Sequence, residues 1–370
     1  MNRKIFFVMP FVLLALIIGS YNGLLRIGWD LPYNKAMAQH GAIMVGSFLG
    51  TLILLERIVI FRKTWLYIFP IINGMSIFFF LTGRFILAMD CLLIGAVATS
   101  GIYFYLYHQH RETFLLIMLI GALSLIGGYM MLLHTHLYPT SAPFWIAFIL
   151  LTIIGERLEL TKFLPPGRLK IYLLLFSIML YFVGLYFDFH GPGQYLIGTS
   201  LVIFSAWLLF YDIAFKSVRL SGLHRYIAVN LISGYAWLFV TGCLLMLTSE
   251  MKFIYDAILH AFFLGFTFSM ILAHGPIILP GVAGIARKPF HPVLYMWGVI
   301  LQVSLAARVI GDFYENLNTR EISGLVNMIA ILGFFLNVLI LMKFSNPKSQ
   351  VPNSKPHVPN SKSQVPNSKP

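Results

Sequence analysis

Charged side chains are scarce in this sequence. They make up 11% of its 370 residues, whereas 59% are apolar; soluble domains are about a quarter charged and about half apolar. This composition excludes a soluble enzyme and a protein that binds nucleic acid. There are only two cysteines, so a disulfide scaffold is excluded as well. Because Cys91 and Cys243 lie inside apolar runs, we expect them to be packing residues.

The apolar residues fall into twelve runs, most of them close to the roughly 20 residues that a membrane-spanning helix needs. The alternation of period two that barrel strands show is missing, and a lipid-exposed backbone must satisfy its own hydrogen bonds. We therefore predict an all-α fold, a polytopic membrane protein with twelve transmembrane helices in a lipid bilayer. They cover approximately residues 5–24, 36–55, 65–82, 85–107, 113–133, 142–156, 169–187, 194–215, 226–248, 253–279, 291–310 and 322–342.

Positive charge predicts the orientation of these helices. Twelve spans place 20 of the 26 lysines and arginines on one side and 6 on the other, and the side richer in these residues is cytoplasmic. Both termini are then expected in the cytoplasm, with the chain in a bacterial inner membrane. The first run could instead be a cleaved signal peptide, since it follows Arg3 and Lys4. We count it as a helix because one span fewer would destroy the charge asymmetry.

The composition changes abruptly at Ser345. From Gln350 the chain reads QVPNSKP, HVPNSKS, QVPNSKP, three polar heptads without an apolar seam. Such repeats cannot build a packed core, so residues 345–370 are predicted to be a disordered cytoplasmic tail. The predicted domains are a twelve-helix transmembrane domain over residues 1–344 and this tail.

A dipeptide recurs at the ends of two predicted helices. Glu56-Arg57 closes the second and Glu156-Arg157 closes the sixth, 100 residues later. The spacing suggests three related units of four helices, with the second, sixth and tenth helices in equivalent places, although the tenth helix lacks the pair. Snorkelling at the cytoplasmic ends and ion pairs between helices explain the dipeptides without a further function.

Two histidines inside predicted spans are the main candidates for chemistry, because polar groups in a bilayer are expensive. His40 and His260 lie near the outer ends of the second and tenth helices, which run in the same direction. Two neutral imidazoles at one depth are what a six-coordinate haem iron requires as axial ligands. Gly41, Gly46 and Gly265 would leave room for a flat macrocycle. Alternatively, each histidine only forms a hydrogen bond to a neighbouring helix.

Other histidines suggest a second metal. His134 and His136, before the sixth helix, could bind copper together with His190, at the outer end of the seventh. The alternative is that all three are exposed to water at the membrane surface. His274 lies 14 residues after His260, nearly four helical turns, so both histidines share one helix face and His274 is a second candidate metal ligand. A kink at Gly275-Pro276 is the simpler interpretation of this position.

Three segments carry a resemblance to a known family. They are AQHGAIMVGSFLGTL (38–52), HAFFLGFTFSMILAHGPIILPGVAG (260–284) and HPVLYMWGVILQVSLAARV (291–309). They resemble the NnrS family, membrane proteins that contain haem and copper and are linked to nitric oxide metabolism. The resemblance implies His40 and His260 as haem ligands. It marks His274 as a family-like position of unknown role.

The helix arrangement also resembles subunit I of haem-copper oxidases, where the second and tenth helices hold the low-spin haem. That family has two histidines one residue apart on the tenth helix and a His-His pair on the seventh, and this sequence has neither. Oxygen reduction and proton pumping are therefore not expected. The resemblances imply a b-type haem protein, with copper as a second metal and nitric oxide as a candidate ligand, in nitric oxide response or respiratory electron flow. The alternative is a transporter or permease without haem, and no motif identifies a catalysed reaction.

Overall fold

The computed structural model describes residues 5–61, 63–161, 167–187, 191–247, 251–282 and 289–344. Every regular element in these ranges is a helix, and twelve helical spans are long and apolar enough to cross a membrane, which confirms the predicted fold class. The predicted tail, residues 345–370, lies outside the described residues. The elements are α1 (Ile5–Ile27), η1 (Met37–Gln39), α2 (His40–Ala42), η2 (Ile43–Gly50), α3 (Thr51–Val59), η3 (Thr64–Tyr67), α4 (Ile68–Leu81), α5 (Phe85–His110), α6 (Thr113–Thr135), α7 (Tyr138–Leu160), α8 (Arg168–Tyr186), α9 (Pro192–Tyr211), α10 (Ala214–Ser217), α11 (Gly222–Met246), α12 (Ile254–His260), η4 (Ala261–Thr267), α13 (Phe268–Val282), α14 (Val293–Phe313) and α15 (Leu317–Phe344).

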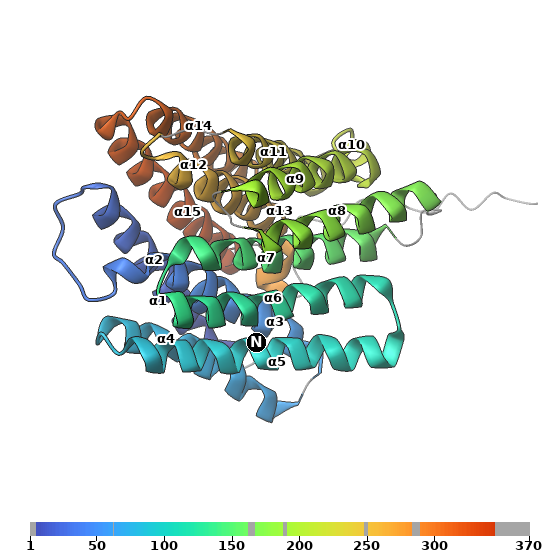
Figure 1. Cartoon of the computed structure of the whole chain (residues 1–370), viewed down its shortest axis with the longest axis horizontal. Helices are drawn as coiled ribbons and strands as arrows, with labels where there is room; N and C mark the ends of the chain where they lie inside the picture. The colour runs from blue at the N-terminus through green and yellow to red at the C-terminus, as the bar shows by residue number, and fades with distance from the viewer. Residues whose placement is uncertain are drawn as a thin grey trace, which may run out of the picture.

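Short turns join successive helices into antiparallel pairs, as Figure 1 shows for α5, α6 and α7. Arg111 ends α5 and His136 ends α6, each with a positive φ, the left-handed conformation that stops a helix. Pro139 follows at the start of α7, and Pro192 begins α9. Proline suits the first helical turn because its missing N–H has no partner there. These residues fix where the chain reverses.

Three of the spans are more buried than the others. The second (Met37–Val59), sixth (Tyr138–Leu160) and tenth (Ile254–Gly281) are each 72% buried, whereas the other described spans are 33% to 56% buried. They follow one another at intervals of four spans, the spacing at which the Glu-Arg dipeptides suggest a repeat. Polar contacts join α3 to α7 and α7 to α13. The polar centre of the molecule is therefore built on these three spans.

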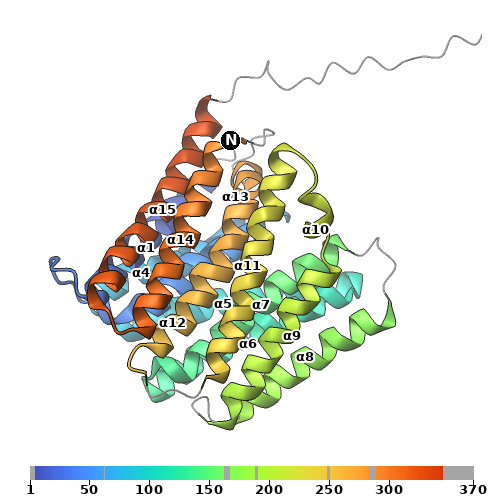
Figure 2. The ribbon, with the colours of Figure 1, turned by 90° about the horizontal axis from the view of Figure 1, so that it is seen from above.

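The first and last helices pack against each other, as Figure 2 shows. The Trp29 indole, just after α1, donates a hydrogen bond of 3.0 Å to the backbone carbonyl of Glu321 in α15. α1 also packs on η2 and α4. The two ends of the helical domain thus lie side by side.

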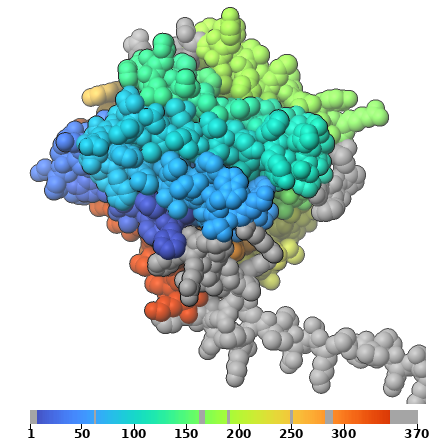
Figure 3. Space-filling view, turned by 90° about the horizontal axis from the view of Figure 1, so that it is seen from below, coloured from blue at the N-terminus to red at the C-terminus, as the bar shows by residue number. Residues whose placement is uncertain are grey.

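The outward faces of the helices are apolar. The face in Figure 3 is formed largely by the segment from α4 to α6 (light blue to teal), whose exposed side chains include large hydrophobic ones. Many large apolar side chains exposed in this way are stable in lipid rather than in water. Exposed large apolar residues on α4 and α5 are Ile68, Met75, Phe78, Ile86, Leu87, Ile94, Val97 and Phe104.

Candidate functional site

His40 and His260 lie next to each other in the structure. Their ring centroids are 6.5 Å apart, and the ring planes are inclined by only 18°. His40 comes from the start of the second span and His260 from the end of α12 in the tenth. Both are half-buried. The two histidines expected at matched depth therefore face one another across the interface of two buried spans.

The hydrogen bonds of both imidazoles define where their protons lie. His40 Nδ1 is 2.8 Å from the carbonyl oxygen of Gly19 in α1, and His260 Nδ1 is 2.8 Å from the carbonyl oxygen of Asp256. A carbonyl oxygen only accepts, so Nδ1 must carry the proton in each ring. In the neutral imidazole the lone pair is then on Nε2, which is the usual state of a histidine that binds a metal.

A π-helical segment follows each of these histidines. η2 runs over Ile43–Gly50, shortly after His40, and η4 runs over Ala261–Thr267, immediately after His260. Such segments are rare and are frequently found at functional sites. In η2 the Asn73 side chain donates to the Gly46 carbonyl at 2.9 Å, so part of the altered backbone pairing is satisfied by α4. The two spans therefore share an uncommon local structure as well as a histidine.

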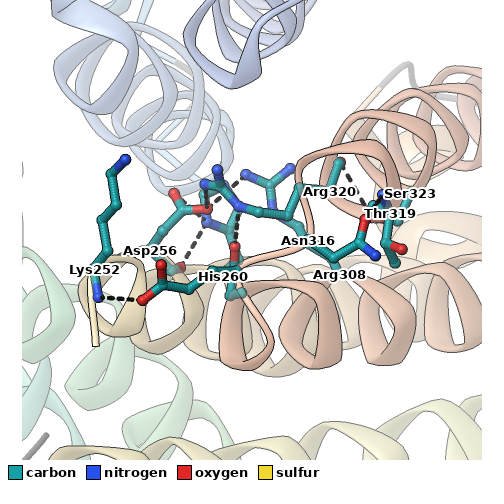
Figure 4. Close-up of polar contacts among 10 residues, drawn as sticks. Lys252, Asp256, His260, Arg308, Asn316, Thr319, Arg320 and Ser323 are labelled. Atoms are coloured by element: carbon teal, nitrogen blue, oxygen red, sulfur yellow. Dashed lines mark hydrogen bonds and ion pairs between the residues drawn. The ribbon is translucent and has the colours of Figure 1, made fainter. Parts of the chain in front are cut away.

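A buried ionic network supports His260 (Figure 4). Asp256, one helical turn earlier, has Oδ1 at 3.2 Å from His260 Nδ1. Its Oδ2 accepts hydrogen bonds from Arg308 in α14 at 2.9 Å and from Arg320 in α15 at 3.2 Å. Arg320 also pairs with Asp312. The two arginines balance the two carboxylates, so Asp256 can hold the imidazole without leaving a net charge in the bundle.

The glycines near the histidines do not leave the room that we expected from the sequence. A Cβ at Gly46 would come within 2.7 Å of Leu92 and of the Tyr129 hydroxyl, and one at Gly265 within 2.4 Å of Trp237. Gly41 similarly faces Tyr138 and Trp145. That expectation was wrong, because these glycines allow close packing of aromatic side chains. By contrast, a Cβ at Gly23 of α1 would lie 3.1 Å from the His40 ring, so this glycine makes space for the imidazole.

His274 belongs to a second polar cluster, and both of its ring nitrogens are engaged. Nδ1 is 2.8 Å from the Met270 carbonyl, and Nε2 is 2.9 Å from the Arg157 guanidinium, which can only donate. Beside it, Arg57 of α3 pairs with Glu156 of α7. The expectation that these dipeptides form ion pairs between helices is thereby confirmed, and the partners are the two dipeptides themselves. α13 continues as a helix through Gly275-Pro276.

The structure separates the members of the predicted copper site from the buried spans. His134 and His136 are exposed near the end of α6, and His190 lies outside the described residues. Among the described residues there is no cluster of three or more histidine, cysteine, aspartate and glutamate side chains arranged to hold a metal ion. Copper binding by these histidines stays a prediction.

Sequence reasoning missed the supporting network of His260. Asp256 precedes His260 by four residues, so the spacing of one helical turn was a readable signal. The last predicted span begins at residue 322, which places Arg320 in a loop. In the structure α15 begins at Leu317, and Arg320 is buried in its first turn. Arg320 pairs with Asp256 across 64 residues, so no local sequence pattern indicates this ion pair.

Comparison with known proteins places the chain in a family. Residues 4–343 match the family model described as "Domain of unknown function (DUF8744)", and the chain belongs to that family. No curated protein and no solved structure matches the chain.

Proposed function

We propose that this membrane protein holds a b-type haem between His40 and His260, and that it acts in nitric oxide response or respiratory electron flow. The observation that supports the proposal is the pair of nearly parallel imidazoles with centroids 6.5 Å apart. The link to nitric oxide, and the bacterial inner membrane with cytoplasmic termini, come from the resemblance to NnrS proteins and from the charge asymmetry.

The separation of the two rings fits one metal between them. A metal–imidazole bond is about 2.0 Å, and a ring nitrogen lies about 1.2 Å from its ring centre, so two opposed ligands have centroids about 6.4 Å apart. The distance in the structure is 6.5 Å. The donor set fits as well, since a carbonyl oxygen accepts from Nδ1 in both rings, and in the neutral form each ring would offer Nε2 to a metal. The ring spacing and the positions of the Nδ1 protons support two-imidazole ligation, whereas the glycines beside the histidines are packed against side chains.

The protein groups have distinct tasks in this proposal. His40 and His260 would hold the haem iron, and the bound group would supply a reversible one-electron couple. The carbonyls of Gly19 and Asp256 keep the two imidazoles in the required tautomer and orientation. The Asp256 carboxylate would increase the electron density of the His260 ring, because its Oδ1 lies 3.2 Å from the protonated Nδ1. Ligation by two imidazoles from the protein would favour electron transfer over a catalysed reaction at the metal.

Absorption spectroscopy of the purified protein tests the proposal. We expect a Soret band, with sharp α and β bands after reduction by dithionite, and we expect His40→Ala and His260→Ala to lose them. His108→Ala is a matched control, because His108 is exposed at the end of α5. Colourless protein with no iron by elemental analysis would refute the haem.

A second set of variants separates ligation from folding. In His260→Met the thioether can still bind iron, so we expect a haem protein with a shifted spectrum and a higher reduction potential. If His260→Met keeps the wild-type spectrum, His260 is not a ligand. For copper, metal content unchanged in the double variant His134→Ala/His136→Ala would remove these histidines from consideration.

A further inference from the structure

One carboxylate lies on the outer surface of the bundle, inside a membrane-spanning helix. Asp90 belongs to α5 and comes five residues after Phe85, the first residue of that helix, and its side chain is exposed. Among the described residues, it is the only exposed aspartate, glutamate, lysine or arginine that lies outside the first and last four residues of a span. Asp90 therefore puts a charge on a surface that is otherwise suited to lipid.

The residues that share this face of α5 with Asp90 are apolar and exposed. Ile86, Ile94 and Val97 lie four residues before it, four after it and seven after it, which is the spacing of one helix face. Their exposed fractions are 57%, 44% and 57%. Gly101, about three turns beyond Asp90, has open space where a Cβ would point. A small residue on an apolar face allows another helix to approach closely, so the face has the form of a helix–helix contact with one carboxylate in it.

The Asp90 carboxylate forms no hydrogen bond or ion pair with any described residue, including Arg84, the nearest arginine in the sequence. The five residues before it, 85–89, are all apolar and place it about 7.5 Å along the axis from the start of α5. An aspartate side chain is too short to extend over this distance to the membrane surface, as the longer side chains of lysine and arginine do. Because a charge in lipid without a partner is costly, a cation at the same depth would stabilise this position.

A second copy of the chain does not offer this cation. Packed through the same face, it would set Asp90 against Asp90, and like charges at close range repel each other. No described span presents an exposed lysine or arginine outside its first and last four residues. We propose that the α5 face around Asp90 binds a transmembrane helix of a partner protein, apolar where it meets α5 and carrying one lysine or arginine at the depth of Asp90. This surface does not depend on the metal proposed at His40 and His260.

Two synthetic transmembrane peptides test the proposal, each a leucine helix of about 20 residues. One carries a lysine six residues from each end, so that either orientation places a lysine at the depth of Asp90, and the other has leucine at both places. Full-length protein with a donor fluorophore at its C-terminus is reconstituted with acceptor-labelled peptide in phosphatidylcholine vesicles, and energy transfer gives the dissociation constant. We expect the lysine peptide to bind at least tenfold more tightly. Equal binding of the two peptides would overturn the proposal.

Variants assign the binding to this face of α5. Asp90→Asn keeps the size of the side chain and removes its charge, so the preference for the lysine peptide should fall below twofold. Gly101→Phe fills the open position without changing any charge and should weaken binding of the lysine peptide at least threefold. Asp30→Asn is the matched control, because Asp30 is an exposed aspartate in the loop after α1, outside the spans. A preference in Asp90→Asn as large as that of wild type would place the peptide elsewhere and overturn the proposal.

Light scattering of the purified protein in detergent tests the other occupant of this face, a second copy of the chain. We expect Asp90→Leu to leave the mass of the particle unchanged. A wild-type dimer that becomes a monomer in Asp90→Leu would show that a second copy covers the face, which would also overturn the proposal.

Discussion

Replacing Asp256 with asparagine tests the ionic network beneath His260. The substitution keeps the size of the side chain but removes the charge that faces Arg308 at 2.9 Å and Arg320 at 3.2 Å. At these distances each attraction is roughly 5 kcal/mol with an effective dielectric constant of about 20, before the cost of desolvation is subtracted. Breaking a buried pair by removing one partner reduces the unfolding free energy by about 3–5 kcal/mol.

We expect a loss of about 3 kcal/mol for Asp256→Asn, the lower end of that range, because the Asp256 side chain is 29% exposed. The unfolding free energy is measured by titration with SDS in mixed micelles, followed by far-ultraviolet circular dichroism. The control is Asp30→Asn, an exposed aspartate in the loop after α1.

The double variant Asp256→Asn/Arg308→Met separates the ion pair from general damage. Methionine removes the cation that the first substitution leaves unpaired, so the two changes should be non-additive by about 0.5–3 kcal/mol. The reasoning is refuted if Asp256→Asn lies within about 0.5 kcal/mol of wild type, the range of ordinary surface substitutions. Strict additivity in the double variant would show that Asp256 and Arg308 do not stabilise each other.

Three further predictions concern packing, pH and topology. Gly46→Ala should lower the unfolding free energy by about 1–3 kcal/mol, because the new Cβ would meet side chains at 2.7 Å. Gly101→Ala is the control and should not lower the unfolding free energy, because the space around Gly101 is open. Equal losses in the two variants would contradict the close packing at Gly46. Burial raises the pKa of the Asp212 carboxyl above its ordinary 3.8, so the folded state binds this proton more tightly than the unfolded state does. The stability that the bound proton contributes is therefore lost as the pH rises from about 4 through the raised pKa. Thermal unfolding midpoints should therefore fall less over this window in Asp212→Asn, and an unchanged pH profile would show that the carboxyl is not responsible. Reporter fusions after Asp30 and after Lys343 should report opposite sides of the membrane, with the second in the cytoplasm.

The number of spans was predictable from the sequence because it depends only on the length and apolarity of successive runs. The depth of His40 and His260 was predictable for the same reason, since both lie close to the start of runs with the same direction. The Glu-Arg dipeptides also indicated ion pairs between helices, and Arg57 does pair with Glu156. The length and apolarity of the runs therefore predicted the spans, and the dipeptides predicted an ion pair between helices.

The π-helical segments and the packing of glycines were not predictable. η2 and η4 have the same apolar composition as an α-helix, and their backbone is set by tertiary partners such as Asn73, whose amide holds the Gly46 carbonyl. A glycine in sequence shows only that space is needed. Whether Trp237 or a cofactor occupies the space beside Gly265 is decided by neighbouring helices.

The pairing of His40 with His260 has a consequence for the order of events during synthesis. His260 lies 220 residues after His40, and at about 5–20 residues per second the ribosome needs roughly 10 to 45 s to reach it. During this interval the second span is in the membrane without its partner, and α1 lacks α15 as well. The polar face around His40 therefore stays without its partner in the tenth span until the ribosome has passed residue 260.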